Sequence, residues 1–156
     1  MRILGIDYGD SRVGIAMTDP LGITAQGIET IHHNGNDKIV LKRLEELINE
    51  YDVDTIVIGL PINMNGTKAD RVQVTENFIH KLKCKFSGIT IERIDERLTT
   101  VEAHKTMNFL NVNKFKKKGI VDTISAVYIL ETYLRKNKNW KEINNGKGFF
   151  WRRGSK

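Results

Sequence analysis

The chain has 156 residues, 40% of them hydrophobic and 28% charged, and its formal net charge is +6. This length and composition predict a single globular domain with an apolar core. The single cysteine excludes an intramolecular disulfide framework and a zinc site of the CxxC type. No apolar run approaches the roughly 18 residues of a membrane span, and the N-terminus shows no signal-peptide pattern. We therefore expect a cytoplasmic protein with no membrane partner.

Hydrophobic periodicity predicts an α/β protein. Residues 2–7 and 12–18 alternate as two strands, and the short turn YGDS between them is typical of an antiparallel hairpin. The remaining predicted elements are a strand near 24–31, a helix over 37–50 capped by Asn36, a buried strand at 54–61, a helix that begins at Asp70, a strand at 88–95, a helix that begins near Thr99 and a last helix over 120–136. This order predicts a mixed five-stranded sheet, with its first three strands antiparallel and α/β crossovers after them, flanked by helices within residues 1–137.

Two segments supply the excess positive charge. Residues 114–118, KFKKK, contribute +4, and residues 138–156 contribute +5 from six basic side chains and Glu142. The other residues therefore have a formal net charge of −3. Concentrated basic charge attracts polyanions, and the aromatic side chains of the second segment are able to stack on bases. We treat 138–156 as a separate basic tail, which is either disordered or bound to nucleic acid.

Four acidic residues are predicted to lie at one edge of the sheet. Asp7 ends the first strand, Asp95 and Glu96 end the last strand, and Asp122 begins the last helix. Taken singly, an acid at such a position is usually a turn former or a partner of the helix dipole. Four at one edge, in a sequence without competing zinc or nucleophile motifs, indicate a catalytic carboxylate metal site.

Hard carboxylate oxygens suit Mg²⁺ or Mn²⁺, and two such ions about 4 Å apart are suited to phosphodiester hydrolysis. We expect Asp7 to be the shared metal ligand and Asp122 to complete the site. Adjacent residues of a strand point to opposite faces, and we favour the longer Glu96 over Asp95 as the third ligand. Asp10 and Asp19 are weaker candidates: we expect Asp10 to form an Asx-type turn and Asp19 to end a strand. The four histidines show no ligand spacing, so we expect them to pack or to face solvent.

Basic residues near these acids are candidates for contact with phosphates. The loop 62–71 precedes a predicted helix and resembles a backbone-phosphate site. Arg12 and Arg97 lie close to these acids in the sequence, and for both of them a surface ion pair is the alternative role. The predicted nucleic-acid contacts are Arg12, Arg97, Lys68, Arg71, Lys114, Lys116, Lys117 and Lys118.

Four segments together resemble the YqgF/RuvX family: DYGDSRVGIAMTD (7–19), GLPINMNGT (59–67), DERLTT (95–100) and DTISA (122–126). The resemblance extends from residue 1 to about 136 and departs from the usual family pattern at Ser125, where an alanine is usual. It implies an RNase H-like fold and a nuclease that trims the 5′ end of the 16S rRNA precursor. Cleavage of Holliday junctions is the older attribution of the family, so branched DNA is the alternative substrate.

Two other classes of protein share parts of this pattern. An actin-like or sugar-kinase-like ATPase has a similar first turn, but it needs a second domain and further phosphate motifs for which 156 residues leave no room. A non-catalytic nucleic-acid-binding module is the other alternative, although all the motif acids are present. The sequence therefore predicts a metal-dependent nuclease, either a monomer or a weak homodimer, with precursor rRNA as its favoured partner.

Overall fold

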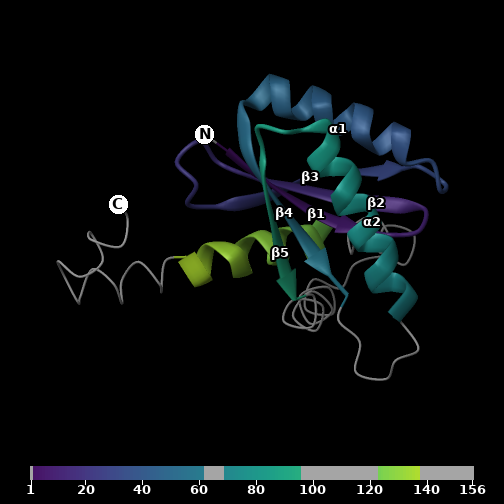
Figure 1. Cartoon of the computed structure of the whole chain (residues 1–156). Coiled ribbons are helices and arrows are strands. Elements are labelled where there is room, and N and C mark those ends of the chain that lie inside the picture. Colours follow the sequence, from purple (N-terminus) through teal and green to yellow (C-terminus); the bar gives the residue numbers. More distant parts are fainter. Residues whose placement is uncertain (1, 62–68, 96–122, 138–156) are drawn as a thin grey trace, which may run out of the picture.

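The computed structural model describes residues 2–61, 69–95 and 123–137, and a five-stranded sheet runs through them (Figure 1). The strand order is β3-β2-β1-β4-β5, so β1 is central. β2 is antiparallel to both β1 and β3, whereas β4 is parallel to both β1 and β5. The strands are β1 (Arg2–Tyr8), β2 (Arg12–Thr18), β3 (Ala25–His32), β4 (Val53–Leu60) and β5 (Thr90–Asp95). The predicted mixed sheet is confirmed.

Helices lie on both faces of this sheet (Figure 1). α1 (Asp37–Tyr51) and α2 (Ala69–Lys85) lie on one side, and a helix at residues 123–137, yellow-green in the figure, lies on the other. We call these sides the α1–α2 face and the 123–137 face. No helix in the described ranges is long and apolar enough to cross a membrane. The helix predicted from Thr99 and the tail 138–156 lie outside the described residues.

Local sequence explains the ends of α1. The side chain of Asn36 accepts a hydrogen bond from the backbone N–H of Lys38 at 3.1 Å, which confirms the predicted N-cap. Asp52 ends the helix in the left-handed region, with a φ of 55°, and its N–H bonds to the carbonyl of Ile48. β4 begins at the next residue, so the chain turns from helix to strand without a longer loop.

The α1–α2 face carries large buried side chains. Leu4, Ile6 and Tyr8 alternate along β1 and pack into one apolar cluster with both helices. Leu44 of α1 and Phe78 of α2 are almost completely buried in this cluster. Burial of these side chains is the main source of stability on this side of the sheet.

The 123–137 face is built from smaller residues that let its helix approach closely. Gly5 pairs with Ala16 on β2, and Ala16 pairs with Gly27 on β3. A Cβ atom at Gly5 would lie 2.5 Å from Cγ of Leu130 and 2.9 Å from the carbonyl oxygen of Ala126. Glycine at this position therefore permits contact between β1 and the helix backbone, which a larger residue would prevent.

Candidate functional site

Asp7 lies in the middle of the sheet, one residue before the end of β1, and it is half-buried. Its partner on β2 is Gly14. On the other side, the register that pairs Ile6 with Ile58 places Gly59 of β4 beside Asp7. Because neither neighbour has a side chain, the carboxylate is flanked along the sheet by glycine on both sides.

The Asp7 side chain belongs to the 123–137 face. Residues two apart in a strand share a face, and Gly5 contacts the helix on that side. The helix also reaches the register row of Asp7: Gly14 pairs with Thr30 of β3, whose Oγ1 lies 3.4 Å from Oγ1 of Thr123. Thr30 is two strands from Asp7, or about 10 Å. The first described residue of the helix therefore packs over the row that contains Asp7.

Asp95 belongs to the opposite face. It is the last residue of β5 and pairs with Leu60. Arg93, two residues earlier, forms an ion pair with Glu76 of α2, with Nε 2.7 Å from Oε1. Side chains two residues apart in a strand point to the same face, so Asp95, like Arg93, points to the α1–α2 face, away from Asp7. The structure thus assigns the two described candidate acids to different faces of the sheet.

Two of the predicted phosphate-contacting arginines lie at the same end of the sheet as Asp7. Arg12 is the first residue of β2 and lies two residues before Gly14, the partner of Asp7. The Arg12 side chain therefore points to the 123–137 face. Arg71 extends from α2, donates a hydrogen bond of 3.0 Å to the carbonyl oxygen of Tyr8, and forms an ion pair with Asp10. Both arginines are therefore near the turn that follows Asp7.

The two weaker acidic candidates have structural partners. The carboxylate of Asp19 accepts hydrogen bonds from the N–H groups of Ile23 and Thr24, at 2.7 and 2.9 Å, as expected of a residue that ends a strand. These bonds lower the pKa of Asp19, with that from Thr24 contributing most. Asp10, which we expected in an Asx-type turn, pairs with Arg71. No local sequence pattern links Asp10 to a residue 61 positions away.

Tyr8 fixes the backbone next to Asp7 from the α1–α2 face. Its hydroxyl donates a 2.6 Å hydrogen bond to Oδ1 of Asp37, and Lys81 Nζ lies 2.8 Å from Oδ2 of the same carboxylate. The Tyr8 ring stacks on Phe78 and on His33, with ring centroids 4.2 and 5.7 Å away. Burial, together with the nearby Asp37 carboxylate, raises the pKa of Tyr8 far above its usual value. Tyr8 is therefore a permanent donor at neutral pH.

His33 fixes the turn itself. It is 2% exposed, and its Nδ1 accepts a hydrogen bond from the N–H of Gly35 at 3.1 Å. We therefore assign the proton to Nε2, which lies 2.9 Å from the carbonyl oxygen of Gly9 and donates to it. This packing role agrees with the expectation for the histidines. The contribution of Tyr8 and Asp37 was not predicted, because their contact joins residues 29 positions apart.

The described part of the chain holds one of the three predicted metal ligands. Within residues 2–61, 69–95 and 123–137, no three His, Cys, Asp or Glu side chains gather into a metal-ligating group. Asp7 offers hard oxygen donors, which suit Mg²⁺ or Mn²⁺. The other predicted site residues lie outside the described ranges: Glu96, Asp122, Lys68, Arg97, Lys114, Lys116, Lys117 and Lys118.

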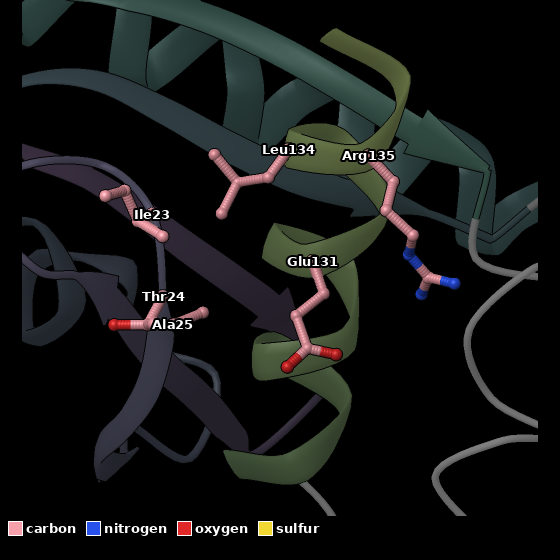
Figure 2. A pocket seen from close by; sticks show the side chains of 6 residues that line it. All are labelled: Ile23, Thr24, Ala25, Glu131, Leu134 and Arg135. Atoms are coloured by element: carbon pink, nitrogen blue, oxygen red, sulfur yellow. The ribbon is translucent and has the colours of Figure 1, made fainter. Parts of the chain in front are cut away.

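A pocket of about 560 Å³ lies at the other end of the sheet (Figure 2). Its walls come from the segment before and at the start of β3 and from the last turns of the helix at 123–137. In Figure 2, Leu134 points towards Ile23, whereas Arg135 points away. Ala25 in its wall pairs with Thr18, at the end of the sheet opposite Asp7. This pocket is therefore separate from the Asp7 site.

Comparison with known proteins gives a family match over most of the chain. Residues 1–136 match the family model described as "RuvX: Holliday junction resolvase". Two curated relatives carry the name "Putative pre-16S rRNA nuclease". The one from Ruminiclostridium cellulolyticum is 59% identical over 86% of this chain and 94% of its own length, and the one from Acetivibrio thermocellus is 52% identical over 86% and 95%.

Solved structures give matches of lower identity. RuvC from T. thermophilus, in complex with a Holliday junction substrate, matches with a TM-score of 0.55 and 12% identity, over 87% of this chain and 96% of that chain. The fowlpox virus Holliday junction resolvase matches with a TM-score of 0.50 and 13% identity, over 87% and 99%. At this identity the likeness concerns the fold alone. Together with the strand order, it confirms the expected RNase H-like fold.

Proposed function

Because the chain belongs to the RuvX family, we propose that it is a divalent-metal-dependent nuclease that hydrolyses phosphodiester bonds. The observation that carries the proposal is the position of Asp7: half-buried near the end of the central strand, flanked by Gly14 and Gly59, on the face covered by the helix at 123–137. A carboxylate fixed on a rigid central strand holds its position relative to a bound phosphate. Loop residues at the same end of the sheet would then define the substrate.

Asp7, Glu96 and Asp122 are the residues that we propose to hold Mg²⁺ or Mn²⁺. We favour Glu96 over Asp95 because Asp95 points to the α1–α2 face, away from Asp7. Asp122 directly precedes Thr123, which packs over the register row of Asp7. When bound, such metals lower the pKa of water and neutralise charge on the phosphate.

The chain's own groups have separate roles in this proposal. Asp7 supplies carboxylate oxygens on the 123–137 face. Arg12, on the same face, is suited to contact a flanking phosphate, and a guanidinium does so with two parallel hydrogen bonds. Tyr8 and His33 act only through the backbone, because they anchor the turn after Asp7 from the other side. They are positioning residues in this scheme.

We favour precursor 16S rRNA as the substrate, with trimming at its 5′ end, because the relatives at 52–59% identity carry a pre-16S rRNA nuclease name. The second candidate is a Holliday junction, the substrate in the description of the family model. Cleavage of a junction on two strands requires two active sites and hence a dimer. The favoured form of this proposal is a cytoplasmic monomer or weak homodimer acting on RNA.

The decisive test compares the wild-type chain with Asp7→Asn on two substrates, a precursor rRNA fragment and a synthetic four-way DNA junction, with Mg²⁺ or Mn²⁺ and with EDTA. We expect cleavage of the rRNA fragment to require the metal and to fall at least about 100-fold in Asp7→Asn, since removal of one group that stabilises charge in a transition state costs about that much. Cleavage of the junction alone would favour the second candidate.

Asp54→Asn is the matched control for this test. Asp54 lies near the start of β4, the neighbouring strand, at the opposite end of the sheet. The control makes the same chemical change without touching the Asp7 row, so we expect its activity to equal that of the wild type. Equal activity of Asp7→Asn and Asp54→Asn would contradict the proposed site. Binding of RNA without any cleavage by the wild type would identify a non-catalytic binding module.

A further inference from the structure

The ion pair between Arg71 and Asp10 lies at the end of β1 that carries Asp7. Nη1 of Arg71 contacts Oδ1 of Asp10, and Nη2 donates to the carbonyl oxygen of Tyr8 at 3.0 Å. Tyr8 directly follows Asp7 in the chain. The two side chains differ greatly in exposure: Asp10 is 82% exposed and Arg71 is 30% exposed. The arginine is thus held by the protein backbone, whereas its carboxylate partner projects into solvent.

The chemistry of this pair fits an exchangeable anion. A guanidinium fork binds a carboxylate and a phosphate in the same geometry, and it often selects phosphates in nucleic-acid complexes. An ion pair with one largely exposed partner contributes little to folding stability. Exchange of the Asp10 carboxylate for another anion would therefore cost little. The hydrogen bond to Tyr8 would keep the guanidinium in place during the exchange.

We propose that Asp10 occupies a phosphate-binding position on Arg71 in the free protein, and that a backbone phosphate of the nucleic acid replaces it on binding. This inference rests on the proposed function, since it assumes that nucleic acid approaches the Asp7 end of the sheet. Asp10 thereby lowers the affinity for every polyanion. A nucleic-acid strand displaces Asp10 only if it can place a phosphate on Arg71 while it makes its other contacts with the protein.

Binding measurements in the Asp7→Asn background test the proposal without cleavage of the ligand. The probe is a labelled single-stranded precursor rRNA fragment, followed by fluorescence anisotropy over a range of salt concentrations. We expect Asp10→Asn to tighten binding by about threefold to tenfold at low salt, because it removes a competing charge close to a phosphate. The salt dependence should also steepen, by up to about 0.7 in the slope, because only the wild type releases an Asp10 carboxylate that takes up a cation when the phosphate binds Arg71.

Asp52→Asn is the matched control in the same background. Asp52 is exposed, precedes β4 at the far end of the sheet, and has a φ of 55° that asparagine readily adopts. The Asp52→Asn substitution therefore removes one negative charge, and we expect no loss of folding stability from it. If Asp10→Asn binds no more tightly than Asp52→Asn, the proposal is overturned, because the gain then reflects net charge alone.

Arg71→Gln completes a double-mutant cycle with Asp10→Asn. We expect Arg71→Gln to weaken binding and to abolish the gain from Asp10→Asn. A gain that persists without Arg71 would overturn the proposal. Thermal melting checks that each variant folds, and Arg71→Lys replaces Arg71→Gln if the latter does not, because lysine keeps the charge but loses the fork.

The control outcomes separate this inference from the proposed function. If the Asp7→Asn chain binds neither the rRNA fragment nor a DNA junction, both the proposed function and this inference fail. If it binds and Asp10→Asn has no specific effect, the inference alone fails. The predicted gain in affinity, restricted to chains that retain Arg71, would support both.

Discussion

The two faces of the sheet are packed in different ways, although they share the same five strands. The α1–α2 face presents large aliphatic and aromatic side chains, such as Leu4, Ile6 and Phe78, to two helices. The 123–137 face presents Gly5 and Gly27 at places where its helix comes very close to the sheet. The first face is thus held by the volume of its side chains. On the second face Val57 and Ile94 also pack against the helix, but its close approach to β1 and β3 depends on glycines without side chains.

This difference explains why the candidate chemistry is on the 123–137 face. Asp7 has Gly14 and Gly59 as its neighbours in the sheet, so no side chain from either adjacent strand stands next to it in its register row. Large side chains on the opposite face anchor the same strand. The α1–α2 face therefore stabilises the position of Asp7, while the 123–137 face is the side on which the Asp7 carboxylate could bind a metal ion. Substitutions on the two faces should have different consequences.

The largest effect on stability is expected from Phe78→Ala on the α1–α2 face. Phe78 is 1% exposed and stacks on Tyr8 at 4.2 Å between ring centroids. Its truncation should lower the free energy of unfolding by about 3–5 kcal/mol, as for other buried aromatic residues. Urea denaturation measures this loss. Phe78→Leu is the control, with a smaller loss, because it retains most of the apolar volume. Equal losses for the two variants would contradict the role of side-chain volume on this face.

A somewhat smaller effect on stability, with a distinct effect on activity, is expected from Gly5→Ala on the 123–137 face. The added Cβ would lie 2.5 Å from Cγ of Leu130 and 2.9 Å from the carbonyl oxygen of Ala126, so the helix must shift. We expect a loss of about 1–3 kcal/mol, typical of overpacking. Because this helix packs over the Asp7 row, nuclease activity per folded molecule should also fall.

Gly88→Ala provides the control for that substitution. Gly88 has no heavy atom within 4 Å of the position of an added Cβ, and it is not among the glycines with positive φ. The same chemical change should therefore leave the stability unchanged or raise it slightly, by up to about 1 kcal/mol. If Gly5→Ala resembles Gly88→Ala in both stability and activity, close packing on the 123–137 face is not important.

The sequence was sufficient to predict the order of elements, because that order depends on local patterns. The alternation in residues 2–7 and 12–18, the cap at Asn36 and the continuous apolar run at 54–61 all predicted elements that the structure contains. Their boundaries differ by only a few residues. The close approach of the helix at 123–137 was not predictable in this way. It depends on Gly5 and Gly27 lying in one register row, and a register is a property of strand pairing.

The candidate site was predictable in part for the same reason. Asp7 at the end of an apolar strand is visible in a short segment, as is Asp95 at the end of the last strand. The contacts that hold the turn after Asp7 are not local: Arg71 reaches Asp10 across 61 positions, and Tyr8 reaches Asp37 across 29. Polar contacts between distant segments leave no period in the sequence. Only the three-dimensional arrangement assigned partners to Asp10 and Tyr8.

The smallest effect in this series is expected from Tyr8→Phe, which tests how the α1–α2 face supports the turn after Asp7. The variant keeps the ring stacked on Phe78 and His33 but loses the 2.6 Å hydrogen bond to Asp37. Asp37 keeps its ion pair with Lys81. Loss of one hydrogen bond to a charged group should lower the free energy of unfolding by about 1–2 kcal/mol near neutral pH.

The pH dependence of this loss identifies Asp37 as the partner. Burial raises the pKa of Asp37, but hydrogen bonds from Lys81 and Tyr8 outweigh burial and leave it below its usual value. A carboxyl group whose pKa is lowered by folding stabilises the protein above its unfolded pKa of about 4, and this contribution is lost as the pH falls through the folded value. The difference between wild type and Tyr8→Phe should therefore be constant above about pH 5 and narrow below about pH 4. Urea denaturation across this range measures it. A difference that does not change with pH would mean that the hydroxyl acts through a group other than the Asp37 carboxylate.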